Sequence, residues 1–288
     1  MKTKIIDSRK IAQEIKSDLA KKVLKLDHKP SLAVIMIGDD KASYLYIKQK
    51  EKAAIETGIT LCKYFFKQDN DKKEVFDTIE WLNKDGQING MIVQLPLPQA
   101  WPTEKIIKAI NPKKDVDGLL NKEFVPPFIS AIISALESIE QNLNKKKILA
   151  LVNSDVFGKK MCQHLKEKGW NASYVIARTP IFSRRTKQSR IIPRDCHALT
   201  SSKLAMTKSA DILITALGQP NFIKADMIKK DSILIDAGIS FKDGKVTGDI
   251  DAASVSKKAA YLCPVPGGIG PITVAMLLKN VIIASQNN

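Results

Sequence analysis

The chain has 288 residues, of which 44% are hydrophobic, so it is long enough for two modest domains that each bury a core. No apolar run is long enough to cross a membrane and no signal-peptide pattern opens the sequence, which predicts a cytoplasmic protein with no membrane partner. The net charge of +16 comes mainly from lysines spread through amphipathic segments; we interpret it as a bias toward solvated lysines, and nucleic acid is not an expected partner.

The first half of the chain alternates between helical and strand patterns. Apolar residues at every fourth position from Ile11 to Val23 mark one face of a helix, and the apolar run 32–37 before Gly38 is typical of a buried strand. The next expected elements are a helix at 41–57 that ends at Gly58, a strand at 60–66, a helix at 72–84 and a strand at 90–94. This order predicts a parallel sheet with helices on both faces.

A second alternating unit starts with the apolar run 147–152 and predicts a Rossmann-like domain. Its further elements are a helix at 157–168 and strands at 172–177, 211–216 and 232–236. A helix at about 126–140 is expected to cross between the domains. We therefore predict an α/β protein with an N-terminal domain at 1–125 and a Rossmann-like domain at 126–271.

The four cysteines and three histidines are scattered along the chain. No Cys-x-x-Cys spacing occurs, and the histidines do not pair at a spacing that would ligate a metal. Neither a disulfide framework nor a metal site is expected.

The segment from Cys263 to Thr273 contains three prolines and three glycines, which predicts a fixed loop rather than a helix or a central strand. An apolar helix is expected to begin directly afterwards, at Val274. Its first free amide groups would face the loop and suit a polar or anionic ligand.

Tyr46 and Lys50 lie four residues apart in the helix predicted at 41–57, and Ser43 precedes Tyr46 by three, so the three side chains share one helix face. A tyrosine and a lysine at this spacing are usually only a surface pair. Other segments of the chain give the pair more weight.

Four segments occur in the order and near the spacing of one enzyme family. They are 43–53, 93–98, 112–118 and 263–273. Together they resemble the bifunctional methylenetetrahydrofolate dehydrogenase/methenyltetrahydrofolate cyclohydrolase family, and the resemblance covers nearly the whole chain. The resemblance implies two α/β domains with a cleft between them, a last helix at 272–288 that packs on the N-terminal domain, tetrahydrofolate derivatives as substrates, and a homodimer.

The resemblance implies roles for residues on the folate side. Lys50 would be the main acid/base of the cyclohydrolase step, Tyr46 would hold the substrate, and Gln94 would interact with Lys50. Asp117 would grip the pterin ring, whereas Asp115 is expected to have a structural turn or cap role. Because an ordinary lysine is a poor base at pH 7, burial must lower the pKa of Lys50. Further substrate-binding residues implied are Ser43, Pro266, Gly267 and Gly268.

The cofactor side departs from the family pattern. Relatives carry a Gly-Arg-Ser-x-x-Val-Gly-x-Pro turn, of which this chain keeps Ser154 and Gly158 but has Asn153 where the arginine stands. The resemblance implies NADP as the cofactor. Because that arginine is the natural partner of the NADP 2′-phosphate, Asn153 weakens the case for NADP, and NAD is possible. The implied cofactor-binding residues are Ser154, Gly158, Gly218, Ile239, Gly268 and Thr273.

Two alternatives follow from these departures. The first is a cyclohydrolase whose dehydrogenase activity is weak, altered or lost, because the segment 126–131 also lacks the family pattern. The second is a noncatalytic paralogue that binds RNA or protein through a basic insertion near 178–200, which holds five of the six arginines. The same insertion could instead be solvated, or could clamp a cofactor phosphate.

Overall fold

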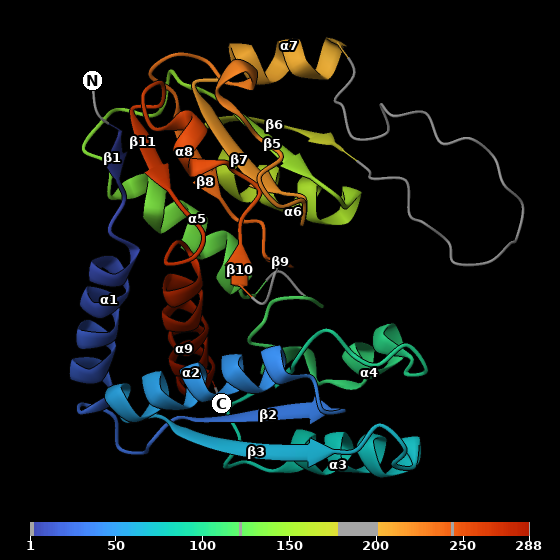
Figure 1. The fold of residues 1–288 in the computed structure, drawn as a ribbon. Coiled ribbons are helices and arrows are strands. Elements are labelled where there is room, and N and C mark those ends of the chain that lie inside the picture. Colours follow the sequence, from blue (N-terminus) through green and yellow to red (C-terminus); the bar gives the residue numbers. More distant parts are fainter. Residues whose placement is uncertain (1–2, 121–122, 178–200, 243–244, 288) are drawn as a thin grey trace, which may run out of the picture. The chain divides into compact units, whose positions relative to one another are not determined.

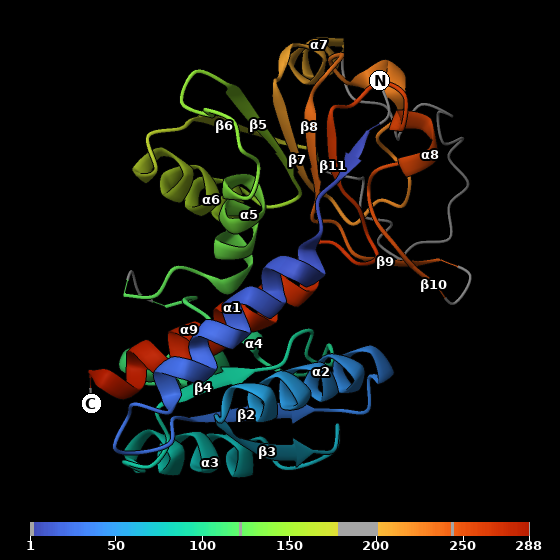
Figure 2. The same cartoon turned by 90° about the vertical axis from the view of Figure 1, so that its left-hand side faces the viewer.

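The computed structural model describes residues 3–120, 123–177, 201–242 and 245–287. The arginine-rich segment 178–200 lies outside the described residues. The chain divides into two compact units, which are described one at a time (Figures 1 and 2). The N-terminal unit comprises Arg9–Ala131 and Gly270–Asn288, and the second unit comprises Met1–Ser8 and Ile132–Ile269.

The N-terminal unit is built on a three-stranded parallel sheet in the order β3-β2-β4. The predicted strands are confirmed; their bounds are β2 (Ser31–Ile37), β3 (Thr60–Phe66) and β4 (Gly90–Val93). The central strand β2 is buried along its whole length, which explains its uninterrupted apolar sequence.

Helices cover both faces of this sheet, α2 on one face and α3 on the other (Figure 1). Successive residues of β2 serve two separate cores, because side chains alternate across a strand. Leu32 and Val34 pack in the core that includes residues of α2 and α9, whereas Ala33 and Ile35 pack in the core that includes α3 and α4. The helices of this unit are α1 (Ser8–Val23), α2 (Lys41–Thr57), α3 (Lys72–Lys84), α4 (Thr103–Ala109), α5 (Pro127–Glu137), which continues into the second unit, α9 (Gly270–Gln286) and the 3₁₀ helix η1 (Pro112–Lys114).

The last helix, α9, groups with the N-terminal unit, as the resemblance implies. Its apolar residues join the core of α2 and β2, and the buried Asn280 donates hydrogen bonds to the carbonyls of Val116 (2.9 Å) and Val125 (3.0 Å). The helix begins at Gly270, two residues before the start that the resemblance implies and four before the start of the apolar run at Val274. Pro271 permits this, because a proline in the first helical turn sacrifices no intrahelical hydrogen bond.

The second unit is built on a six-stranded parallel sheet in the order β1-β11-β8-β7-β5-β6. Its strands are β1 (Lys4–Ile5), β5 (Lys147–Val152), β6 (Asn171–Ile176), β7 (Ile212–Ala216), β8 (Ile233–Asp236) and β11 (Tyr261–Cys263). The other elements are α6 (Asp155–Glu167), α7 (Ser201–Ser209), α8 (Ala252–Val255), the 3₁₀ helix η2 (Ala225–Met227) and the antiparallel pair β9 (Ser240–Lys242) and β10 (Lys245–Thr247).

The pairing of β1 with β11 places the first eight residues in the second unit. This differs from the domain of 1–125 predicted from the sequence. The physical reason is that β1 has only two residues, and its place depends on hydrogen bonds to a strand more than 250 residues later.

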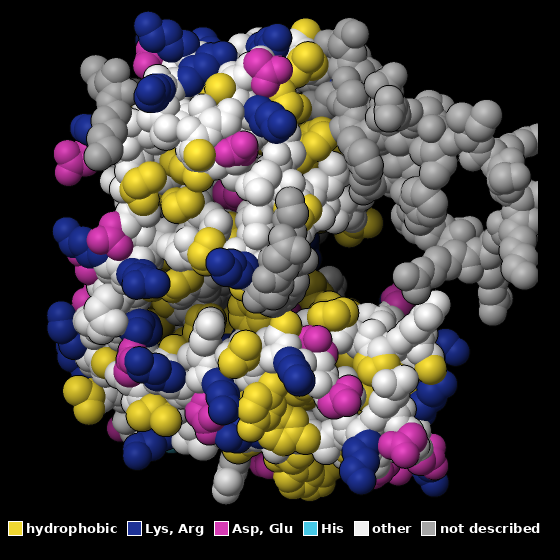
Figure 3. Space-filling view, in the orientation of Figure 1, with side chains coloured by type: hydrophobic (Ala, Val, Ile, Leu, Met, Phe, Trp, Pro, Cys, Tyr) yellow, Lys and Arg dark blue, Asp and Glu magenta, His cyan; other side chains and the backbone are white. Residues whose placement is uncertain are grey.

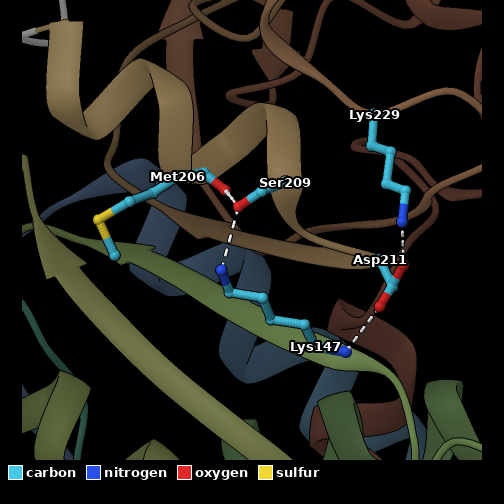
Figure 4. A network of polar contacts seen from close by, with 5 residues as sticks. All are labelled: Lys147, Met206, Ser209, Asp211 and Lys229. Atoms are coloured by element: carbon cyan, nitrogen blue, oxygen red, sulfur yellow. Dashed lines mark hydrogen bonds and ion pairs between the residues drawn. The ribbon is translucent and has the colours of Figure 1, made fainter.

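A polar network joins the amino ends of β5 and β7 to α7 (Figure 4). The carboxylate of Asp211 accepts hydrogen bonds from the backbone N–H of Lys147 (2.8 Å) and from the ammonium of Lys229 (2.6 Å). Lys147 Nζ donates to Ser209 Oγ at 3.1 Å, and that hydroxyl donates to the carbonyl of Met206 at 2.9 Å. The network lies at the amino ends of the strands. Open α/β sheets bind their ligands at the opposite edge, at the carboxyl ends of the strands.

Hydrophobic side chains gather on the surface over α2 and β3 (Figure 3). Tyr44, Leu45 and Phe65 are about half exposed, at 46%, 57% and 51%, and line a groove of about 1050 Å³. Among the described residues, no helix is long and apolar enough to span a membrane.

Candidate functional site

Helix α2 carries Ser43, Tyr46 and Lys50, and its two ends are both capped. The Asp40 carboxylate accepts a hydrogen bond from the backbone N–H of Ser43 at 2.7 Å, and Gly58 ends the helix in the left-handed conformation at a φ of 76°. The helix therefore begins and ends where the sequence predicts. Ser43 is buried, while Tyr46 and Lys50 are half-buried.

Lys50 contacts the residue that the resemblance implies. Its Nζ donates to Gln94 Oε1 at 2.6 Å. Gln94 directly follows β4; its backbone N–H donates to the carbonyl of Ile35 (2.8 Å) and its Nε2 donates to the carbonyl of Leu95 (2.8 Å). Since the Nε2 group is already engaged, the amide oxygen is the atom held toward the lysine.

Burial lowers the pKa of Lys50, against an opposing effect from the nearby Asp117 carboxylate. The direction predicted from the sequence is confirmed. A neutral amide accepts the hydrogen bond without adding a negative charge, so Gln94 orients the amine while leaving its pKa depressed. Burial also raises the pKa of Tyr46, which keeps its phenol protonated and able to donate a hydrogen bond.

Asp117 and Asp115 have different surroundings. Asp115 is buried, and its Oδ2 accepts the backbone N–H of Leu120 at 2.6 Å, which confirms the structural turn role expected for it. A bridge between Asp115 and Met91 lays this segment beside β4. Asp117 is half-buried and close enough to Lys50 for its charge to act on that amine. Lys50, Gln94 and Asp117 therefore lie together in the N-terminal unit.

The glycine-rich loop with Pro266, Gly267 and Gly268 belongs to the second unit and joins β11 to α9. Gly267 has a φ of 89°, which disfavours other residues. A Cβ on Gly268 would lie 2.1 Å from the carbonyl oxygen of Pro264, so only glycine fits there. Pro266 and Gly267 are exposed and present their backbone to solvent.

The predicted cofactor-binding residues of the second unit lie where strands end. Ser154 caps α6, its hydroxyl accepting the backbone N–H of Phe157 at 3.5 Å, and Gly158 lets α6 approach β6, because a Cβ there would lie 2.4 Å from the Tyr174 ring. Gly218 follows β7 with a φ of 72°, and Ile239 follows β8 with 40% of its surface exposed. Gly268 follows β11, whereas Thr273 lies in α9 of the N-terminal unit.

Family profiles match the chain in two consecutive blocks. The profile described as "Tetrahydrofolate dehydrogenase/cyclohydrolase, catalytic domain" matches residues 6–117, and the profile described as "Tetrahydrofolate dehydrogenase/cyclohydrolase, NAD(P)-binding domain" matches residues 126–288. The chain belongs to the tetrahydrofolate dehydrogenase/cyclohydrolase family. The predicted family and fold class are thereby confirmed: an N-terminal catalytic domain and a Rossmann-like NAD(P)-binding domain.

Curated relatives match the chain over nearly their full length. It is 36% identical to the bifunctional protein FolD of Caldanaerobacter subterraneus subsp. tengcongensis, over 99% of this chain and 97% of that protein. It is 38% identical to the bifunctional protein FolD of Nautilia profundicola, over 98% and 97%.

Solved structures of the family match the fold. The bifunctional enzyme FolD of Campylobacter jejuni superimposes with a TM-score of 0.84 at 32% identity, over 99% of each chain. The Trypanosoma brucei enzyme, complexed with NADP cofactor and inhibitor, gives a TM-score of 0.87 at 26% identity, over 100% of this chain and 98% of that one.

Two aspartates of the second unit were not named as candidate site residues, although the turn 236–239 and the pair Gly248-Asp249 resemble loops of the family. Asp236 and Asp249 are both buried. The available signal was a pair of short patterns, Asp-x-Gly at 236–238 and Gly-Asp at 248–249. Their spacing gives no hint that the two carboxylates approach each other.

Proposed function

We propose that this chain catalyses two steps of folate one-carbon metabolism. These are the oxidation of 5,10-methylenetetrahydrofolate to 5,10-methenyltetrahydrofolate with NADP, and the hydrolysis of the methenyl compound to 10-formyltetrahydrofolate. The observation that carries the proposal is the Lys50 amine, which has a depressed pKa, is held by the Gln94 amide and lies beside Asp117. The names of the FolD relatives support both activities.

In the hydrolytic step, water adds to the methenyl carbon, and the ring that contains this carbon opens. Lys50 in its neutral form takes the proton of the attacking water and returns a proton to the departing ring nitrogen. Gln94 holds the amine in place, and the protonated Tyr46 helps to orient the substrate. Asp117 accepts hydrogen bonds from the amino and N–H groups of the pterin.

The second unit fits a dinucleotide. A ligand can come close to the backbone at the edge of the sheet where such ligands bind. The places are the capped amino end of α6, the exposed Gly218 after β7 and the exposed Gly267. We propose that Ser154, Gly158, Gly218, Ile239, Gly268 and Thr273 hold the cofactor. NADP, when bound, would accept the hydride of the methylene carbon.

A cyclohydrolase with weak, altered or lost dehydrogenase activity is the second candidate. The observation that favours it is Asn153, whose side-chain amide donates to the carbonyl of Leu217 at 3.3 Å in place of a cation for the 2′-phosphate. NAD as the cofactor would also fit this turn, because NAD has no 2′-phosphate. We further propose a cytoplasmic homodimer, as the family resemblance implies.

A paired assay of the purified protein tests the proposal. It follows the loss of methenyltetrahydrofolate, and the formation of that compound from methylenetetrahydrofolate with NADP or NAD. Lys50→Ala should lower cyclohydrolase turnover by about 10²- to 10⁴-fold, the usual contribution of an acid/base residue. Lys52→Ala removes an exposed lysine of the same helix and should leave turnover unchanged. Full turnover in Lys50→Ala would refute the assignment, and hydrolysis without oxidation would select the second candidate.

A further inference from the structure

Two buried carboxylates lie at the carboxyl edge of the second unit's sheet. Asp236 ends β8 and is 1% exposed, and Asp249 is 0% exposed. Asp236 Oδ1 accepts the backbone N–H groups of Gly238 (3.1 Å) and Asp249 (3.0 Å), and its Oδ2 accepts that of Ile250 (2.9 Å). One side chain thus ties the turn after β8 to the segment 248–250.

Asp249 extends the connection to a third segment. Its Oδ2 accepts the backbone N–H of Leu217 at 2.7 Å, and its Oδ1 accepts that of Gln219 at 2.7 Å. These two amides flank Gly218, in the loop that leaves β7. The pair therefore fixes the main chain of two neighbouring loops, 217–219 and 237–239, through hydrogen bonds to backbone groups. The hydroxyl of Thr215 also donates to Asp236 Oδ1, at 3.5 Å.

The two aspartates are also locked together by shape. A Cβ on Gly238 would lie 2.0 Å from Asp249 Cγ, and a Cβ on Gly248 would lie 2.0 Å from Asp236 Oδ2. Each carboxylate therefore fills the space beside a glycine of the opposite segment. Neither glycine can therefore be replaced without moving a carboxylate.

The loops held by this pair are open toward solvent. Gly218 is exposed. Among the described residues other than its chain neighbours, Ser240 Oγ alone comes within 4 Å of the position of its Cβ, at 4.0 Å. Ile239 is 40% exposed. Burial of two carboxylates is costly, and an apolar core could hold these loops in place at less cost. The carboxylates accept hydrogen bonds from specific backbone N–H groups at the edge of the sheet where ligands bind, and this role explains why they are present.

We propose that Asp236 and Asp249 are positioning residues for the dehydrogenase reaction, which hold loops 217–219 and 237–239 in the conformation that binds the dinucleotide. The inference rests on the proposed function, because it needs a cofactor at this edge. It assigns neither aspartate a contact with substrate or cofactor. It predicts that the loss of either aspartate weakens cofactor binding and leaves the hydrolysis of methenyltetrahydrofolate unchanged.

The test measures dinucleotide affinity by calorimetry with NADP and with NAD, together with KM and kcat for both activities, in Asp249→Asn and Asp249→Ala. Both variants should weaken dinucleotide binding by about tenfold or more, and Asp249→Ala should have the larger effect. The KM and kcat of the cyclohydrolase reaction should stay unchanged. Gly238→Ala should have the same effect. The double variant Gly238→Ala/Asp249→Ala should be no worse than Asp249→Ala, because the new methyl group enters the space of the removed carboxylate.

Asp211→Asn is the matched control. This carboxylate also accepts a backbone N–H of the second unit, but at the amino ends of the strands, so the change should lower stability and leave cofactor affinity unchanged. Equal affinity in wild type and Asp249 variants, or equal weakening by Asp211→Asn, would overturn the inference alone. Failure of the wild type to bind either dinucleotide would overturn the proposed dehydrogenase function and the inference with it.

Discussion

Gln94→Glu replaces the side-chain amide beside Lys50 with a carboxylate of nearly the same shape. The amide oxygen lies 2.6 Å from the lysine Nζ, so a carboxylate at this position would face the amine directly. An opposite charge this close to a partly solvated amine stabilises the ammonium form by about 1.4–4 kcal/mol. Since each 1.4 kcal/mol is about tenfold, the fraction of neutral amine at pH 7 falls by about tenfold to a thousandfold.

Cyclohydrolase turnover should fall by a similar factor at neutral pH and recover as the pH is raised. The assay is the pH dependence of methenyltetrahydrofolate hydrolysis, corrected for the uncatalysed reaction. Gln94→Met serves as the control, because it removes the hydrogen bond without adding a charge and should lower the rate without moving the profile to higher pH. Unchanged turnover in Gln94→Glu, or a profile that does not move upward, would refute the role of Lys50 as a neutral base.

Two further predictions concern stability. Asn280→Leu removes both buried hydrogen bonds that α9 makes to loop carbonyls and should lower the free energy of unfolding by about 1–3 kcal/mol in urea titrations; an unchanged unfolding midpoint would contradict this. Burial raises the pKa of Asp236 to about 7, so its ionisation costs stability in the folded state. Between about pH 4 and pH 7, wild-type stability should therefore decline relative to Asp236→Asn, by up to about 4 kcal/mol. A relative gain over this range would show that the amide donors outweigh burial.

Local signals in the sequence were sufficient for the elements that carry Lys50. The cap at Asp40, the left-handed Gly58 and the apolar run of β2 each determine structure within a few residues, and the predicted bounds of α2 agree with the structure. The contact between Lys50 and Gln94 joins residues 44 positions apart, and only the family resemblance suggested it.

Other features depend on pairing that no local pattern encodes. Strands β1 and β11 have two and three residues, too few to show a period, and they exist because each is hydrogen-bonded to a neighbouring strand. The start of α9 was predicted too late because Gly270 and Pro271 interrupt helices elsewhere. The contacts of the aspartate pair were not predicted, because most of its partners are backbone amides from three separate segments, and backbone groups leave no trace in the residue pattern.

The position of α9 has a consequence for the order in which the protein can form during synthesis. The core around β2 includes apolar side chains from this last helix, such as Leu278 and Val281, which are both 0% exposed. The N-terminal unit therefore cannot complete that core until residues 270–286 have left the ribosome. The first strand likewise waits for β11, so neither unit can close from its earlier residues alone. A chain cut short before residue 270 would leave both Lys50 and its surroundings in an incomplete domain.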